Sequence, residues 1–352
     1  MLIDSTALLE QAVQDVVDSA FQSAGQRCSA CRIVCVQEDV TDAFNQMLAG
    51  AISKLETGDP SRISTDLGPV IDATAQDHIN TYIRDMRAQF EVIAEGARPT
   101  SDGGTFVEPI AFQLNQIGDL SAEIFGPVLH VVTFKADQLG EMIDQINALG
   151  FGLTMGLHSR IDARVAHVAA RARVGNLYVN RNQIGAVVGV QPFGGQGLSG
   201  TGPKAGGPNY LARLCQPASQ AGPDAPLQTV ALPGPTGEDN QLTYAPRGRL
   251  LCLGGDAAGV LQAQIMRVKA TGNVPVIADG ETLEDLILSA GIDGVVVDGF
   301  IREEVARLLS QRAGALLPLL SATDETARFY VEKTLTVNTT AAGGNASLLA
   351  QI

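Results

Sequence analysis

The sequence contains no tryptophan, and aromatic residues make up only 5% of its 352 residues, so a buried core must be built mainly from aliphatic side chains. Basic residues are also few, with 24 against 38 acidic residues and a formal net charge of -14. Because a negative field repels phosphate backbones, we expect no nucleic-acid partner. No run of about 20 apolar residues occurs, and Asp4 and Glu10 interrupt the N-terminal region, so we expect neither a transmembrane segment nor a signal peptide.

Cysteine is scarce as well. A count of 5, odd and low, fits a reducing compartment, and we expect a cytoplasmic protein. Three of the five, Cys28, Cys31 and Cys35, lie in "GQRCSACRIVC" at 25–35. No fourth cysteine and no nearby histidine completes a zinc or iron–sulfur site, so we expect no metal.

The cysteine cluster leaves other interpretations open. A redox pair of Cys28 and Cys31 is one, although redox CxxC motifs open a helix after a strand and here the order is helix, turn, strand. A lone nucleophile at Cys28 is another, since Arg27 is a neighbouring positive charge that favours thiolate. An unreactive turn cysteine is the third. We expect Cys28 to be accessible, and Cys35 and Cys252 to be shielded inside strands.

Hydrophobic periodicity predicts alternating helices and strands over residues 1–215. Short apolar runs such as "RIVCV" (32–36), "VLHVVTF" (128–134) and "NLYVN" (176–180) predict buried strands. Amphipathic stretches between them, for example at about 137–149, predict helices. This alternation is typical of an α/β fold with a mostly parallel, helix-covered sheet.

The composition changes in the second half of the chain. Six of the 16 prolines fall in residues 216–247, which predicts an extended Pro/Gly-rich connector. Alternation resumes over 248–335 and predicts a second, Rossmann-like α/β domain. Residues 336–352 are expected to be a tail motif. The stretch 335–349 carries no charge, so we expect it to dock on another surface rather than extend into solvent.

Two motifs, "GQRCSA" (25–30) and "EIFGPV" (123–128), resemble the aldehyde dehydrogenase superfamily. The segment "VNRNQIGAVVGVQPFGGQGLSGTGPKAGGP" (179–208) is similar to the glutamate-γ-semialdehyde (1-pyrroline-5-carboxylate) dehydrogenase module of the proline utilization A family. The ending "TVNTTAAGGNASLL" (336–349) extends this resemblance over essentially the whole chain. It implies NAD-dependent oxidation of a small-molecule substrate, glutamate-γ-semialdehyde, in the second step of proline catabolism.

The resemblance also implies roles for individual residues. Cys28 would be the catalytic nucleophile, passing through a hemithioacetal and a thioester. Glu123 and Phe125 would contact NAD. The substrate would be bound by the following residues: Ser29, Gly185, Ala186 and Phe193. The FAD-containing proline dehydrogenase part, most of the NAD-binding fold and the water-activating glutamate would lie upstream of Met1, so we expect this chain by itself to be inactive.

Alternative interpretations concern the glycine-rich segments and the function. "GQGLSG" (195–200) fits GxGxxG, but Pro203 and Pro208 discourage the helix that a dinucleotide motif requires. "GGDAAG" (254–259) lies between strand and helix with the wrong glycine spacing, so we expect no nucleotide in the second domain. Two alternative functions remain, a non-catalytic assembly or covering module and a dehydrogenase for another aldehyde. A homo-oligomer is compatible with the sequence.

Overall fold

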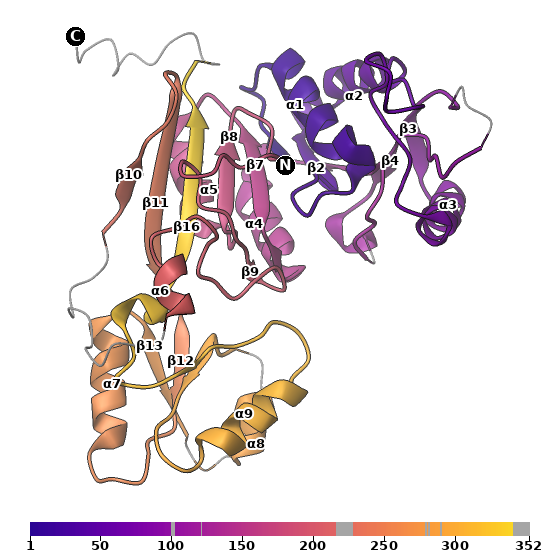
Figure 1. Cartoon of the computed structure of the whole chain (residues 1–352). Helices are drawn as coiled ribbons and strands as arrows, with labels where there is room; N and C mark the ends of the chain where they lie inside the picture. The colour runs from indigo at the N-terminus through magenta and orange to yellow at the C-terminus, as the bar shows by residue number, and fades with distance from the viewer. Residues whose placement is uncertain are drawn as a thin grey trace, which may run out of the picture.

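The computed structural model describes residues 1–99, 103–120, 122–215, 228–278, 280, 282–288 and 291–340. These residues form a ten-stranded sheet and a separate four-stranded sheet, with a two-stranded ribbon beside the larger one. The two sheets belong to two bodies that lie one above the other in Figure 1. The α/β class expected from the sequence is confirmed.

The larger sheet has a parallel centre. Its strand order is β10-β11-β16-β8-β7-β1-β2-β5-β4-β3, and all pairs from β16 to β4 are parallel. The edge strands β3, β11 and β10 pair antiparallel. The strand bounds are β1 Leu2–Ile3, β2 Ile33–Gln37, β3 Glu91–Glu95, β4 Ile110–Leu114, β5 Val128–Phe134, β7 Thr154–His158, β8 Asn176–Val179, β10 Val230–Leu232, β11 Glu238–Pro246 and β16 Tyr330–Asn338.

Helices cover both faces of this sheet because successive strand residues point to opposite sides. Val34 and Val36 pack with α1 and α2, whereas Cys35 packs with α3, α4 and α5. Strands buried on both faces have nearly continuous apolar runs, as "VLHVVTF" shows. The helix bounds are α1 Leu9–Phe21, α2 Glu38–Ile52, α3 Ala73–Arg87, α4 Leu139–Ala148, α5 Asp162–Arg171 and α6 Tyr210–Leu214; the ribbon is β6 Phe151–Gly152 with β9 Gln196–Gly197.

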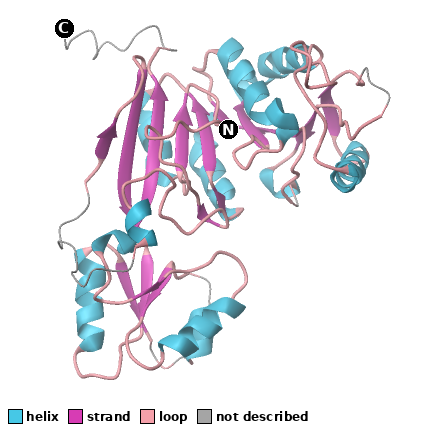
Figure 2. Ribbon diagram, in the orientation of Figure 1, coloured by secondary structure: helices cyan, strands magenta, loops and turns pink. Residues whose placement is uncertain are grey.

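The smaller sheet has the order β13-β12-β14-β15, and every pair in it is parallel. Helix α7 covers one face, and α8 and α9 cover the other (Figure 2). This doubly wound arrangement is the Rossmann-like pattern expected from the sequence. The bounds are β12 Arg249–Cys252, α7 Val260–Ala270, β13 Val274–Ile277, α8 Leu283–Leu288, β14 Gly294–Val296, α9 Arg302–Gln311 and β15 Leu319–Leu320.

The segment expected to be an extended connector differs from that expectation. Residues 230–246 contain β10 and β11, and β11 pairs with β16 over nine residue pairs, from Glu238↔Asn338 to Pro246↔Tyr330. Strand β16 also crosses position 335, where the sequence pattern places a domain end. The small domain is therefore inserted between two strands of the larger sheet. The domain boundaries at 215, 247 and 335 remain a proposal, with one correction: residues 230–246 and 330–338 belong to the larger sheet.

The physical reason for the difference lies in the composition of β16. Its fully buried positions include Thr334 and Thr336 rather than large apolar residues. Their hydroxyls donate to the carbonyl of Pro192 at 2.8 Å and to Oδ1 of Asn240 at 2.8 Å. Buried threonines satisfied in this way leave no apolar alternation for sequence analysis to detect. Of the tail motif 336–352, residues 341–352 lie outside the described residues.

No helix in the described ranges is long and apolar enough to cross a membrane. One apolar core, which contains the fully buried Leu251, lies wholly in the small domain, whereas a second one around Leu250 also includes Tyr330 of β16.

The core around Leu251 predicts the effect of a truncation. Replacing Leu251→Ala is expected to lower the free energy of unfolding of the small domain by about 2–5 kcal/mol, because a buried leucine leaves a cavity. Hydrogen exchange measured peptide by peptide should show faster opening over 249–320. The control Leu261→Ala, 38% exposed on α7, should change stability by no more than about 0.5 kcal/mol. Equal losses for the two variants would contradict a separate core.

Candidate active site

The sheet brings the two superfamily motifs together. Strands β2 and β5 are parallel neighbours in which Ile33 pairs with His130. Cys28 and Phe125 lie the same number of residues before these two partners, so both stand in loops at the amino ends of adjacent strands. The two motifs, about a hundred residues apart in sequence, are therefore in contact in the fold.

The contact between the loops depends on glycine. Gly25 has a φ of 66°, and a Cβ placed on it would lie 2.1 Å from the carbonyl oxygen of Gly126 and 2.9 Å from that of Ala20. No side chain fits there, and the left-handed backbone adds strain for any other residue. The turn that carries Cys28 can therefore approach "EIFGPV" this closely only with glycine at position 25.

Arg32 holds the same contact from the other side. Its Nη1 donates to the carbonyl oxygens of Gly25 at 2.5 Å and Gly126 at 3.4 Å, and its Nη2 donates to that of Arg27 at 3.1 Å. The side chain is only 11% exposed. One guanidinium therefore satisfies three carbonyls from both motifs, which fixes the backbone on either side of Cys28.

Arg32 also orients the two residues expected to contact NAD. Its Nε lies 3.3 Å from Oε1 of Glu123, and its guanidinium carbon lies 4.6 Å from the centroid of the Phe125 ring. Burial lowers the pKa of Arg32, and the Glu123 carboxylate opposes that shift. Glu123 is 38% exposed and Phe125 45% exposed, so both keep a surface open to solvent.

A buried histidine supports Arg32 from beneath. The Nδ1 of His130 lies 2.8 Å from the carbonyl oxygen of Arg32, and its Nε2 lies 2.8 Å from the hydroxyl of Tyr82. Because a carbonyl only accepts, Nδ1 carries the proton and Nε2 accepts from Tyr82. Burial lowers the pKa of His130 to about 4, so the ring is neutral at neutral pH and acts as a fixed spacer.

Cys28 is exposed on a turn closed by the N–H of Ala30 donating to the carbonyl of Arg27 at 3.1 Å. The N–H of Cys28 donates to none of the described atoms, so it is available to an oxyanion. Cys35 differs, because complete burial raises the pKa of its thiol to about 12. The structure thus presents one thiol of this cluster to solvent, since Cys31 is also buried.

The expected carboxylate-binding turn is tied to the cysteine turn by a residue that sequence analysis missed. Gln183 is buried, and its Nε2 donates to the carbonyl of Ser29 at 3.2 Å. Thr154 donates to the same carbonyl at 3.3 Å. Two positions later the backbone enters the left-handed region at Gly185. The N–H groups of Gly185 and Ala186 donate to no described atom, as an anion-binding nest requires.

Phe193 is half-buried, and its N–H and carbonyl pair with Ala205 at 3.0 and 2.9 Å. The next residue is held by Lys204, whose Nζ donates to the carbonyl of Gly194 at 2.7 Å and to Oδ1 of Asn176 at 2.6 Å. Burial lowers the pKa of Lys204 to about 7. These contacts fix the Phe193 turn; its role toward a substrate stays a proposal.

The missed residues had weak signals in the sequence. Arg32 is a charged residue directly before an apolar strand, which is unusual unless the charge has partners. Gln183 and Lys204 are long polar side chains inside glycine-rich motifs, where only the fold shows that they are buried.

The loop after β12 in the small domain is closed by a side chain. The amide of Gln264, fully buried on α7, accepts from the N–H of Gly254 and donates to its carbonyl, both at 2.8 Å. In a dinucleotide-binding loop such N–H groups face phosphate. Among the described residues, no group of three or more His, Cys, Asp or Glu side chains is placed to bind a metal ion.

The fold and the two joined motifs define a class. The chain belongs to the aldehyde dehydrogenase family, whose profile, described as "Aldehyde dehydrogenase family", matches residues 1–219.

More particular similarities follow. The chain is 41% identical to "Bifunctional protein PutA" of Salmonella typhimurium (strain LT2) over 99% of its own length and 32% of that protein's. It is 39% identical to "1-pyrroline-5-carboxylate dehydrogenase" of Geobacillus sp. (strain WCH70) over 60% of this chain and 41% of that protein. The chain thus spans about a third of the length of the PutA relative.

Solved structures give the same pattern. A crystal structure titled as bifunctional proline utilization A (PutA) protein is 52% identical, with a TM-score of 0.58, over 60% of this chain and 22% of that one. Proline Utilization A from Corynebacterium freiburgense has a TM-score of 0.73 over 98% of this chain and 39% of that chain. At 23% identity, the second likeness concerns the fold alone, but it includes the small domain.

The exposure of the thiols predicts their order of alkylation. Under limiting iodoacetamide at neutral pH, Cys28 should be labelled well before Cys35 and Cys252, because the first is exposed and burial raises the pKa values of the others to about 12 and about 11. Peptide mapping by mass spectrometry measures the order. Cys215, which is also exposed, serves as the reference for an accessible thiol. Labelling of Cys35 ahead of Cys28 would show the site to be wrongly assigned.

The glycine contact predicts a second result. Gly25→Ala is expected to destabilise the protein by several kcal/mol, on the order of 3, since a Cβ meets carbonyl oxygens and the backbone has a positive φ. The matched control is Gly50→Ala in α2, where nothing lies within 4 Å of the added Cβ. That variant should gain up to about 1 kcal/mol from helix propensity. Denaturant unfolding compares the two; a tolerated Gly25→Ala would contradict the close approach.

Proposed function

We propose that this chain forms the nucleophile- and substrate-binding part of an NAD-dependent dehydrogenase that oxidises L-glutamate-γ-semialdehyde to glutamate. The observation that carries the proposal is a single constellation. The turn of the exposed Cys28 is joined through Arg32 to Glu123 and Phe125, and through Gln183 to the segment of Gly185 and Ala186, whose N–H groups have no partner among the described atoms. The names of the relatives, PutA and 1-pyrroline-5-carboxylate dehydrogenase, support this substrate.

Cys28 begins the reaction by adding its thiolate sulfur to the aldehyde carbon. A C–S bond forms, and the π electrons of the carbonyl move to oxygen and give an alkoxide. The N–H of Cys28, which has no other partner among the described atoms, can donate to that oxygen. After loss of hydride the resulting thioester is cleaved by water, which releases the acid and returns the thiol.

The surroundings of Cys28 fit a nicotinamide cofactor. The Oε1 of Glu123 faces Arg32, while the side chain remains 38% exposed, so the other carboxylate oxygen can accept from ribose hydroxyls. Arg32 covers one face of Phe125, and the ring keeps an exposed surface for packing. NAD, when bound, supplies the acceptor for the hydride that leaves the substrate carbon.

The substrate carboxylate requires donors that are not themselves anions. Gly185 and Ala186 offer two adjacent backbone N–H groups near a residue with positive φ. The hydroxyl of Ser29 makes no hydrogen bond to described atoms and can donate a third. Binding the carboxylate here would place the aldehyde end of a five-carbon chain toward Cys28, and Phe193 would pack on its methylene groups.

Substrate protection tests this proposal on the chain itself. L-Glutamate-γ-semialdehyde should slow alkylation of Cys28 by about tenfold when supplied at ten times its dissociation constant, because sulfur bound to the aldehyde carbon cannot react. Cys215 should be labelled at an unchanged rate. Propionaldehyde, which lacks the carboxylate, should protect much less at the same concentration.

Two outcomes would contradict the proposal. Equal protection by propionaldehyde would mean that the site does not recognise a carboxylate and serves another aldehyde. No protection at all would support a non-catalytic covering module. With NAD and the semialdehyde, this chain alone should produce no steady NADH, since the resemblance assigns the water-activating glutamate and most NAD contacts to positions that these 352 residues lack. Steady NADH formation that Cys28→Ala abolishes would contradict this last expectation.

A further inference from the structure

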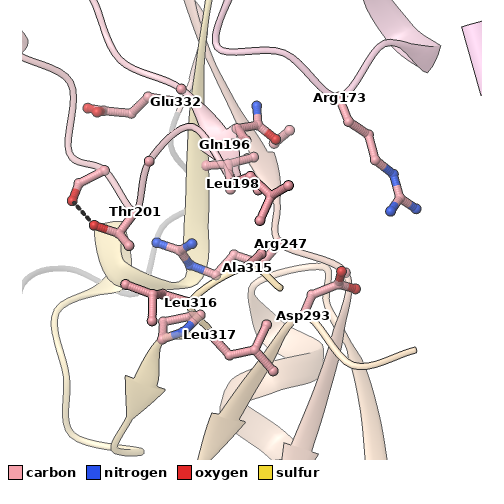
Figure 3. A pocket seen from close by; sticks show the side chains of 18 of the residues that line it. Arg173, Gln196, Leu198, Thr201, Arg247, Asp293, Ala315, Leu316, Leu317 and Glu332 are labelled. Carbon is pink, nitrogen blue, oxygen red and sulfur yellow. Dashed lines mark hydrogen bonds between the residues drawn. The ribbon is translucent and has the colours of Figure 1, made fainter. Parts of the chain in front are cut away.

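A large cavity lies between the two bodies of the molecule, and Cys28, Glu123 and Gly185 are not among the residues that line it. Its volume is about 870 Å³. One wall comes from the larger domain, mainly the loop 195–204 and the end of β11; the opposite wall comes from residues 312–318 of the small domain. Figure 3 shows Leu198 and Thr201 from the first wall facing Leu316 and Leu317 from the second.

The charge of this cavity is opposite to that of the protein. Seven basic residues line it and only two acidic ones, in a chain whose net charge is -14. A concave surface lined by one sign of charge focuses the field and attracts counter-ions. The basic residues are Arg171, Arg173, Lys204, Arg213, Arg247, Arg312 and Lys333, and the acidic ones are Asp293 and Glu332.

Several of these cations are already committed to other groups. Arg171 pairs with Asp144. The ammonium of Lys333 donates to the carbonyls of Ala169 and Ala172 at 2.6 and 2.9 Å. The ammonium of Lys204 likewise donates to the carbonyl of Gly194 and to Oδ1 of Asn176, next to Phe193. These three cations are therefore held by groups of the larger domain.

Arg173, Arg213 and Arg247 are not committed in this way. None of them forms an ion pair with a described carboxylate. The nearby carboxylate of Glu332 is occupied, since it accepts from the N–H of Lys204 at 2.6 Å and from Asn209 at 2.8 Å. None of the three is thus within ion-pairing distance of a described carboxylate, although the charge of Glu332 acts on Arg213 and Arg247 from further away.

Arg247 is the most enclosed of the three. Its Nε donates to the carbonyl of Arg328 at 2.6 Å, while its terminal nitrogens have no described hydrogen-bond partner. Burial first, then the charges of Arg213 and Arg328, lower its pKa to about 10. The guanidinium is still charged at neutral pH, and a positive charge kept in such surroundings gains most from a bound anion.

We propose that this cavity binds a small organic anion whose phosphate or carboxylate oxygens are held by Arg247 together with Arg213. Guanidinium groups donate to such oxygens in a bidentate fashion. The apolar side chains of Leu198 and Leu316 would contact the carbon skeleton of the ligand. The site is separate from the cysteine site and does not depend on the proposed dehydrogenase activity.

Isothermal titration calorimetry of the full chain tests the proposal with pyrophosphate and citrate as probes. We expect at least one of them to bind at a single site, with affinity that falls as salt rises. Arg247→Gln should weaken binding about tenfold or more, as expected for loss of a charge-assisted hydrogen bond. Arg213→Gln, on an exposed side chain, should weaken it several-fold without a risk to folding.

Arg307→Gln is the matched control, because Arg307 is an exposed arginine of the small domain outside the cavity. It removes the same charge and should change the dissociation constant less than about twofold. Preference for pyrophosphate or citrate identifies phosphate or carboxylate as the recognised group. Failure of both probes to bind at millimolar concentration would overturn the proposal, as would equal binding by the wild type, Arg247→Gln and Arg213→Gln.

Discussion

The placement of the cysteine depends on one close backbone contact, between Gly25 and Gly126. The loops can meet at this distance only if position 25 carries no Cβ, and the carbonyl oxygens of Gly25 and Gly126 that come together here need a donor. Arg32 supplies it with a fork of N–H groups. The contact therefore needs a glycine for its sterics and a buried cation for its electrostatics.

The remaining features of the site follow from this arrangement. A buried arginine needs an anionic partner, and Glu123 provides it through Oε1 while 38% of its side chain remains exposed. The neutral ring of His130 fixes the position of the Arg32 backbone through a hydrogen bond to its carbonyl oxygen. The exposed thiol of Cys28 thus stands on a segment that is restrained on both sides, while its own side chain is left in solvent.

Most of the α/β alternation can be predicted from the sequence, because buried parallel strands such as β5 and amphipathic helices such as α1 have strong periodicity. Strands β11 and β16 have no such pattern, because hydrogen-bonded polar side chains such as Thr336 replace apolar ones. For the site, family motifs identified Cys28, and the structure shows it exposed. Motifs do not reveal pairwise geometry, so the roles of Arg32 and Gln183 needed coordinates.

The insertion of the small domain has a consequence for biosynthesis. Strand β8 is an edge strand of the sheet until β16 has been synthesised and pairs with it, as in the pair of Asn176 and Thr334. At roughly 5–20 residues per second, a ribosome needs on the order of ten to thirty seconds to make the intervening chain. During that time the nascent sheet has an unpaired edge beside a nearly finished core, and such edges invite pairing with other chains. Translation speed through the small domain would then set how long the growing protein is vulnerable to aggregation.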